Sequence, residues 1–175
     1  TGSGDLAGTV QKSCPDVSVT GVDFCLPMLR HARKRGLTDL LVADAMNLPF
    51  PDQSQDGVTI GFGLRNLSSW EDGLAEMFRV LRPGGLLVVL DFSLPRRIWL
   101  RKPYAFYLSR ILPRIAGLLT GHRRAYEYLA TSIDRFPSGT AMEKLIASQG
   151  FTQTRCLPQS GGIASIYTAV VPSEN

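Results

Sequence analysis

Short apolar runs alternate with amphipathic stretches through the first half of the chain. The apolar runs have the length of strands, and the stretches between them place apolar residues at helical spacing. Residues 86–92 are apolar almost without interruption, which is typical of a strand covered on both faces. The pattern predicts strands over 17–23, 40–44, 57–62 and 86–92, and helices over 6–12, 27–35 and, capped by Ser68 or Ser69, up to residue 81. Strands and helices alternating in this way predict a parallel sheet with helices on both sides.

The second half of the chain departs from this alternation. Residues 98–135 read as two or three helices that cannot belong to the alternating core, and 140–149 resumes a helix that Gly150 ends. Two β-rich stretches, 151–157 and 163–171, then close the chain as an expected antiparallel pair. We therefore expect one domain over 1–175, with a helical lid insertion over about 96–136.

Composition and cysteine content narrow the class of protein. The sequence has 44% hydrophobic residues and a mean hydropathy of +0.03, as soluble globular proteins do. It shows no apolar run long enough for a transmembrane helix and no signal-peptide pattern. The three cysteines are scattered and form no C-x-x-C, which argues against a disulfide framework and a metal site. These features fit a cytoplasmic protein.

The formal net charge of +4 is unevenly distributed. Residues 92–126 hold eight of the 19 basic residues and no acid, which leaves 11 basic against 15 acidic residues elsewhere. Aromatic residues such as Trp99 and Tyr104 lie among these cations. One interpretation is a lid whose apolar face covers a pocket; a compatible one is that the lid also rests peripherally on an anionic membrane. A basic, aromatic-rich segment could instead bind RNA.

Glycines and strand-terminal carboxylates are the first candidates for ligand binding. Gly2 and Gly4 allow a ligand to approach the backbone, and the helix that follows offers free N–H groups. With Ala7 they also fit the relaxed dinucleotide pattern G-x-G-x-x-A, so NAD stays possible at this point. Asp23 suits either cofactor, because both present ribose hydroxyls to an acid at the end of the second strand.

A second strand-terminal acid begins to separate the two cofactors. Asp44, followed by Ala45, can accept a hydrogen bond from an adenine amino group, although it could equally cap the next turn. Two further runs then need explanation, Gly61-Phe62-Gly63-Leu64-Arg65-Asn66 and Arg82-Pro83-Gly84-Gly85. Their order and spacing favour S-adenosylmethionine.

These runs and others give the chain a family resemblance over almost its whole length. It resembles the UbiE/MenG family, the C-methyltransferases of ubiquinone and menaquinone biosynthesis. The matching runs lie at residues 1–5, 21–24, 28–29, 43–45, 48–52, 58–66, 79–85, 91–93, 112–113, 126–129, 132–133, 136–137, 150–151 and 161–163. The run from Gly61 to Asn66 is specific to this family, whereas the glycine loop and the Arg82 run are general to methyltransferases.

The resemblance implies a class I, Rossmann-like methyltransferase fold, an α/β fold with a mostly parallel sheet of seven strands and an antiparallel last strand. It implies methyl transfer from S-adenosylmethionine to a ring carbon of a polyprenylated quinol. By position, Gly2 and Gly4 would approach the methionine part of the cofactor and Asp23 its ribose. The other expected cofactor-binding residues are Thr1, Phe24, Asp44 and Ala45.

The chain departs from the family pattern at two places. The first strand, expected between those ending near Asp23 and Phe62, is missing, and Thr131 stands where the family has Glu. A missing central strand would leave a gap in the core and unpaired backbone groups on both neighbours. We therefore expect the 175-residue chain to be a fragment that is unstable or inactive on its own.

Arg65, Asn66 and Tyr126 are the expected catalytic residues. A ring carbon becomes nucleophilic as a neighbouring hydroxyl loses its proton, so Arg65 and Asn66 are expected to bind that oxygen as charge develops. Arg65 stays protonated and cannot act as a base; the rival interpretation is that both residues only shape their loop. Tyr126 could hydrogen-bond the quinol or serve in the lid. No general base is assigned, because His122 lies in a basic loop outside the family pattern.

Other functions stay open from the sequence. Demethylmenaquinol is the favoured acceptor, with 2-polyprenyl-6-methoxy-1,4-benzoquinol as the alternative. A soluble small-molecule methyltransferase and a cofactor-binding fold without chemistry are further alternatives. An RNA methyltransferase is disfavoured, because amino-group methyltransferases usually carry an N/D-P-P-Y-like run where Gly61 to Asn66 stands; we thus expect no nucleic-acid partner. The sequence does not determine the oligomeric state, and a homodimer is one of the alternatives.

Overall fold

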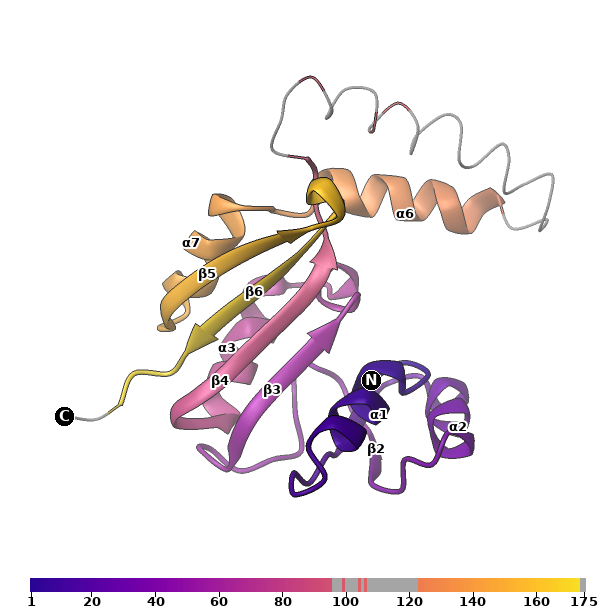
Figure 1. Cartoon of the computed structure of the whole chain (residues 1–175), viewed down its shortest axis with the longest axis vertical. Helices are drawn as coiled ribbons and strands as arrows, with labels where there is room; N and C mark the ends of the chain where they lie inside the picture. Colours follow the sequence, from indigo (N-terminus) through magenta and orange to yellow (C-terminus); the bar gives the residue numbers. More distant parts are fainter. Residues whose placement is uncertain (96–98, 100–103, 105, 107–122, 174–175) are drawn as a thin grey trace.

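The computed structural model describes residues 1–95, 99, 104, 106 and 123–173 (Figure 1). His122 and most of the basic segment lie outside the described residues, as do the side chains of residues 123–127 and 130. In chain order, the elements are α1 (Asp5–Ser13), β1 (Gly21–Asp23), α2 (Leu26–Lys34), β2 (Leu40–Val42), β3 (Gln55–Gly61), the 3₁₀ turn η1 (Leu64–Asn66), α3 (Trp70–Val80), β4 (Leu81–Phe92), α6 (Arg123–Arg135), α7 (Thr140–Ser148), β5 (Thr152–Gln159), the 3₁₀ turn η3 (Ser160–Gly162) and β6 (Ala164–Val170).

The strands form two sheets. One has the order β3-β4-β6-β5, in which β3 and β4 are parallel and β6 runs antiparallel to both β4 and β5. The other is the parallel pair of β1 and β2. The predicted α/β architecture with an antiparallel last strand is therefore confirmed, and the division of the sheet falls between β1 and β3, where the sequence predicts a gap.

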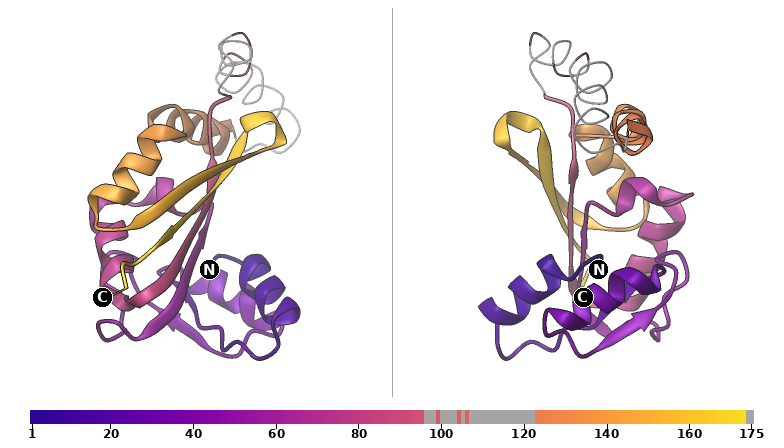
Figure 2. Two further views of the ribbon diagram at one scale, coloured as in Figure 1. Left: turned by 60° about the vertical axis from the view of Figure 1, so that its left-hand side comes forward. Right: turned by 90° about the vertical axis from the view of Figure 1, so that its right-hand side faces the viewer.

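Strand register assembles the main core on one face of the larger sheet. Ile60 pairs with Val89, Val89 with Tyr167, and Tyr167 with Cys156, so one apolar row crosses all four strands. Helices α3 and α7 cover this face (Figure 2). Their buried contacts come from Leu74, Met77, Met142 and Ile146. Helix α1 approaches β3 from the opposite face, since a Cβ built on Gly61 would lie 3.2 Å from Leu6 Cδ2.

Local signals in the sequence explain most element boundaries. Ser69 caps α3 as expected, its side chain accepting a hydrogen bond of 3.1 Å from Asp72 N. The first expected strand is wrong in its first half: only Gly21–Asp23 is extended, and Val17 is exposed. Strand β4 begins at Leu81, earlier than expected, and the register shifts between Gln55 and Gly57.

Among the described residues, no helix is long and apolar enough to cross a membrane.

A second, much smaller core stabilises the N-terminal part. Its buried residues are Ala7, Ala32 and Leu37, with Val19 and Leu40 packed against them. Within the described residues no ladder hydrogen bond joins β1 and β2 to the larger sheet. Because unpaired strand edges and a small apolar core both lower stability, this part should open more easily than the rest.

We expect the two cores to open independently. Leu37 and Leu87 are both fully buried, one in each core, and truncating a buried Leu to Ala costs about 2–5 kcal/mol. In native-state hydrogen exchange, Leu37→Ala should accelerate exchange only in residues 5–42, whereas Leu87→Ala should accelerate it in β4 and β6. Equal acceleration across the whole chain by Leu37→Ala would contradict two separate cores.

Candidate functional site

Polar residues gather where the parallel strands end. Asp23 is the last residue of β1, Asp44 follows β2, and Asp91 lies at the end of β4. The carboxyl ends of paired parallel strands meet at one edge of a sheet, where ligands of α/β proteins bind. The two sheets come together at this edge, because Ser68 Oγ, after β3, lies 3.4 Å from Met46 Sδ, after β2.

Asp23 joins the glycine turn to β1. Its Oδ2 accepts a hydrogen bond of 2.7 Å from Gly2 N and lies 3.3 Å from the Thr1 ammonium, while its Oδ1 accepts one of 2.9 Å from Cys25 N. The Thr1 ammonium also donates to Val22 O at 2.5 Å. The expected cofactor residues Thr1, Gly2 and Asp23 therefore lie together.

Burial and hydrogen bonding act in opposite directions on the Asp23 carboxyl. Burial opposes its ionisation, whereas the hydrogen bonds from the N–H groups of Cys25 and Gly2 favour it, and the pKa of Asp23 lies below its usual 3.8. Asp23 is therefore ionised near neutral pH, and both oxygens of an ionised carboxylate can accept hydrogen bonds from hydroxyl groups.

The two glycines of the turn have different surroundings. Both have positive φ, +58° at Gly2 and +87° at Gly4, a conformation that L side chains rarely adopt. A Cβ on Gly4 would lie 2.6 Å from Leu37 Cδ1 and 3.0 Å from Ala32 Cβ of α2, so close packing also requires glycine there. A Cβ on Gly2 would find its nearest neighbour 3.9 Å away. Helix α1 has no side-chain cap, which leaves its first N–H groups for a ligand.

Exposed apolar side chains surround the strand-end carboxylates. Phe24 is 79% exposed directly after Asp23, and Leu26 and Val42 are also exposed. Asp44 uses Oδ1 to accept a hydrogen bond of 3.0 Å from Met46 N, and Ala45 beside it is half-buried. An exposed apolar surface next to carboxylate oxygens fits a flat group with polar edges, such as an adenine with its ribose.

Arg65 is held by three different partners at the ends of β3 and β4. Its Nη1 donates to Phe62 O at 2.6 Å and to Asp91 Oδ1 at 2.7 Å, and its guanidinium carbon lies 5.0 Å from the centre of the Phe92 ring. Asp91 is fully buried and also accepts hydrogen bonds from Arg65 N, at 3.2 Å, and Phe92 N, at 2.8 Å. Arg65 Nε is buried and has no hydrogen-bond partner among the residues that the structure describes.

Asn66 connects the same loop to helix α6. Its Nδ2 donates to Phe62 O at 3.2 Å, and its Oδ1 accepts a hydrogen bond of 3.2 Å from the Tyr128 hydroxyl. The side chain of Tyr126, the tyrosine expected from the sequence, lies outside the described ones. The structure thus brings Arg65 and Asn66 together and adds two residues that the sequence reasoning missed.

The two missed residues differ in how visible they are in the sequence. Asp91 closes an almost unbroken apolar run, as Asp23 does, and this signal could have marked it. Tyr128 lies two residues beyond Tyr126 on a helix, and no motif distinguishes the two. Only the packing of α6 against η1 identifies Tyr128.

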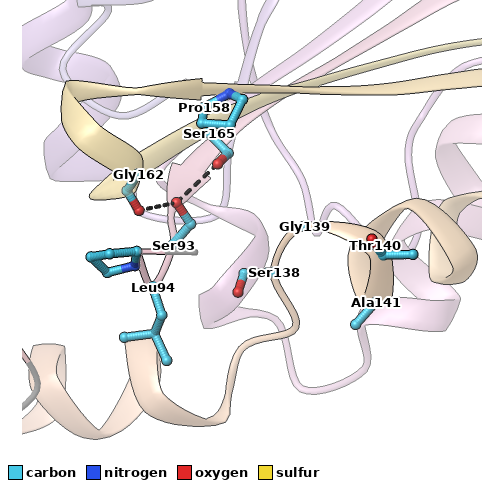
Figure 3. A pocket seen from close by; sticks show the side chains of 10 residues that line it. Ser93, Leu94, Ser138, Gly139, Thr140, Ala141, Pro158, Gly162 and Ser165 are labelled. Atoms are coloured by element: carbon cyan, nitrogen blue, oxygen red, sulfur yellow. Dashed lines mark hydrogen bonds between the residues drawn. The ribbon is translucent and has the colours of Figure 1, made fainter. Parts of the chain in front are cut away.

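A pocket of about 400 Å³ lies beyond the end of β4 (Figure 3). Ser93 and Ser165 form its inner wall, and Ser138 and Thr140 also line it. Ser93 Oγ donates to Gly162 O at 2.8 Å and lies 2.9 Å from Ser165 Oγ. These two buried hydroxyls connect β4 to β6 and η3. Their hydrogen bonds are therefore made within the protein.

Comparisons with known proteins show which family the chain is similar to. Residues 1–171 match the model of the ubiE/COQ5 methyltransferase family. The chain is 42% identical, over 177 aligned positions, to a demethylmenaquinone methyltransferase of Thermus thermophilus, covering 98% of this chain and 80% of the relative. It is likewise 42% identical to the ubiquinone/menaquinone biosynthesis C-methyltransferase UbiE of Geobacter sulfurreducens, covering 96% of this chain and 68% of that protein.

Solved structures support the fold. A methyltransferase dependent on S-adenosylmethionine from Thermotoga maritima, described as a possible histamine N-methyltransferase, is similar with a TM-score of 0.68. The match covers 97% of this chain and 78% of that one at 21% identity, which is a likeness of fold alone.

The lowered pKa of Asp23 predicts an acid-sensitive contribution to stability. A depressed pKa in the folded state stabilises the fold above the unfolded-state value, and this contribution is lost as pH falls through the folded-state pKa. In urea unfolding, wild type should lose more stability between about pH 5 and about pH 3 than Asp23→Asn does. Asp16→Asn, which changes an exposed carboxylate, is the control and should follow wild type. An Asp23→Asn curve that is parallel to wild type would contradict the assignment.

Proposed function

Because the chain belongs to the ubiE/COQ5 methyltransferase family, we propose that it transfers the methyl group of S-adenosylmethionine to a ring carbon of a polyprenylated quinol, with demethylmenaquinol as the acceptor. The observation that carries this proposal is the match, over nearly the whole chain, to a relative named for demethylmenaquinone methylation. The name of the Geobacter relative supports a benzoquinol of ubiquinone synthesis as the second candidate acceptor.

The strand-end carboxylates and the glycine turn form the cofactor half of the site. Asp23 binds the ribose hydroxyls with the outer lone pairs of its ionised carboxylate, and Phe24 and Ala45 lie against the adenine, whose amino group donates to Asp44. Gly2 and the uncapped first turn of α1 receive the methionine part. The bound cofactor supplies an electrophilic methyl group on a sulfonium.

The loop after β3 forms the acceptor half. Transfer is an in-line displacement, so the protein mainly holds the two reactants in line and excludes water. The ring carbon gives the electron pair for the new C–C bond as the bond from sulfur to the methyl carbon breaks and its electron pair stays on the sulfur, which leaves as S-adenosylhomocysteine. The methylated ring carbon then loses its proton to water. Arg65 and Asn66 donate hydrogen bonds to the ring oxygen as it gains negative charge, which lowers the barrier. Tyr128, through Asn66, keeps α6 over this loop.

The polyprenyl tail places the acceptor in a membrane, and the basic segment supports peripheral binding at the inner, anionic surface. That segment, with eight cations between residues 92 and 126, lies mostly outside the described residues. The proposal of membrane contact therefore rests on the sequence alone.

One assay separates the candidate functions. The chain, extended before the glycine turn by the first strand of the family pattern, is incubated with S-adenosylmethionine labelled in the methyl group. Parallel reactions contain demethylmenaquinol, a polyprenyl methoxybenzoquinol, a tail-free naphthoquinol or bulk RNA. Label in the demethylmenaquinol ring is the expected result. Label only in the benzoquinol would assign the protein to ubiquinone synthesis. Label only in the tail-free quinol or RNA, or none despite cofactor binding, would contradict the proposal.

Arg65 should affect turnover far more than cofactor affinity. Losing a donor to developing charge typically lowers kcat by about 100-fold to 1,000-fold. Arg65→Ala also leaves the buried Asp91 charge unpaired, so Arg65→Lys, which keeps a cation, is measured beside it. We expect both variants to lose kcat while the Kd for S-adenosylhomocysteine changes by less than about 5-fold, a difference of about 1 kcal/mol.

Arg82→Ala is the matched control. Arg82 is exposed and pairs with exposed Asp56 at 2.9 Å, a contact of little energetic weight. It should keep both kcat and cofactor affinity. Equal losses of turnover and cofactor affinity in Arg65→Lys would contradict a specific role for Arg65 in the transfer step.

A further inference from the structure

Asp91 is a buried carboxylate that pairs with Arg65 and has no part in the transfer step proposed above. Its exposed fraction is 0%, and that of its partner Arg65 is 11%. Removing such a pair from water carries a large desolvation penalty. A buried ion pair therefore often stabilises a fold no more than apolar side chains of similar size would. The pair therefore calls for an explanation other than stability.

The geometry of the pair leaves part of the guanidinium unused. A side-on pairing would let Nε and one terminal nitrogen bind the two carboxylate oxygens, as Arg–carboxylate pairs frequently do. Here Asp91 Oδ1 accepts a hydrogen bond from Nη1 of the guanidinium, and Oδ2 accepts one from the backbone N–H of Arg65. Nε is buried without a partner, and within the described part of the chain Nη2 has no hydrogen bond. A buried donor left unpaired is destabilising, so this orientation does not satisfy all the hydrogen-bond donors of Arg65.

Asp91 and two neighbouring groups together fix that orientation. Phe62 O binds Nη1 from the same loop, and the Phe92 ring lies against the guanidinium carbon. Asp91 itself cannot move, because Arg65 N and Phe92 N hold its carboxylate to the backbone of both strand ends. The carboxylate also balances the Arg65 charge within this buried site.

We propose that Asp91 is a positioning residue for methyl transfer: its buried carboxylate holds Arg65 by Nη1, so that Nη2 is kept available to hydrogen-bond the oxygen of the acceptor ring. This inference rests on the proposed function and deepens it. It assigns a role to the Asp91-Phe92-Ser93 run, in which the carboxylate directs Arg65 and the Phe92 ring supports it. Asp91 itself accepts no proton and touches no substrate.

Two Asp91 variants test the proposal in the full chain. Asp91→Glu keeps the charge but moves the carboxylate by one methylene, and a misplacement of about 1 Å can lower turnover by about 100-fold. Asp91→Asn removes the charge and should lower kcat by at least as much, about 100-fold. The Kd for S-adenosylhomocysteine should change by less than about 5-fold in both. If Asp91→Asn does not fold, the kcat and the Kd of Asp91→Glu decide the outcome.

A double-mutant cycle with Arg65 distinguishes positioning from a general structural role. If Asp91 acts through Arg65, the variant Arg65→Ala with Asp91→Asn should lose no more kcat than Arg65→Ala alone, because residues that act as a unit are not additive. The double variant should also melt above either single variant, since it leaves no unpaired buried charge. If the double variant instead loses kcat by the product of the two single losses, or if both Asp91 variants keep the wild-type kcat, the proposal is overturned.

A readout without an acceptor keeps this inference separate from the proposed function. The NMR signal of the Arg65 Nε–H group, assigned by its absence in Arg65→Lys, should be sharp and slow to exchange in wild type. In Asp91→Asn it should broaden or exchange faster, whereas Asp52→Asn, which removes an exposed partner of Arg79, should leave it unchanged. An Arg65 signal unchanged in Asp91→Asn would overturn the positioning role even if no quinol is methylated by wild type.

Discussion

Aspartates at the ends of parallel strands hold the candidate site together by accepting hydrogen bonds from backbone N–H groups. Asp23 binds the glycine turn and the start of α2 through Gly2 N and Cys25 N. Asp44 binds its own loop through Met46 N, and Asp91 binds the loop after β3 through Arg65 N. Because a carboxylate has several acceptor positions, each can organise a loop and still present lone pairs elsewhere. The same residue type thereby shapes the loops and supplies the polar groups of the site.

The division of the sheet has consequences for how these loops work. The cofactor half stands on β1, β2 and a core of three buried side chains, whereas the acceptor half stands on the large core beneath β3 and β4. The described contacts between the halves are local, such as Leu6 with Gly61 and Met46 with Ser68. A ligand that contacts both halves would add interactions across the division, and so would stabilise the fold through binding.

Hydrophobic periodicity was enough to predict the order of strands and helices, because each strand of the core is a short apolar run between turn residues. It failed at Val17, which is apolar but exposed and outside any strand. The sequence also placed Asp23 and Asp44 after apolar runs, and the structure shows them at or just beyond the ends of β1 and β2. Their roles, like that of Arg65, stay predictions. The partner of Arg65 could not be predicted, because the contact with Asp91 joins residues 26 positions apart and depends on the parallel register of β3 and β4. Tyr128 was hidden for the same reason, because its contact with Asn66 joins residues 62 positions apart and depends on the packing of α6 against η1.

A crystal structure with S-adenosylhomocysteine and a quinol analogue bound would test most directly the claim that these strand ends form one site for methyl transfer. We expect the ribose hydroxyls to bind Asp23 and the adenine to lie beside Phe24 and Asp44. A quinol oxygen should lie within hydrogen-bond distance of Arg65 while Arg65 stays paired with Asp91. The sulfur atom should face the ring carbon beside that oxygen. A quinol bound away from Arg65, or an Arg65 that leaves Asp91 when the ligands bind, would contradict the account.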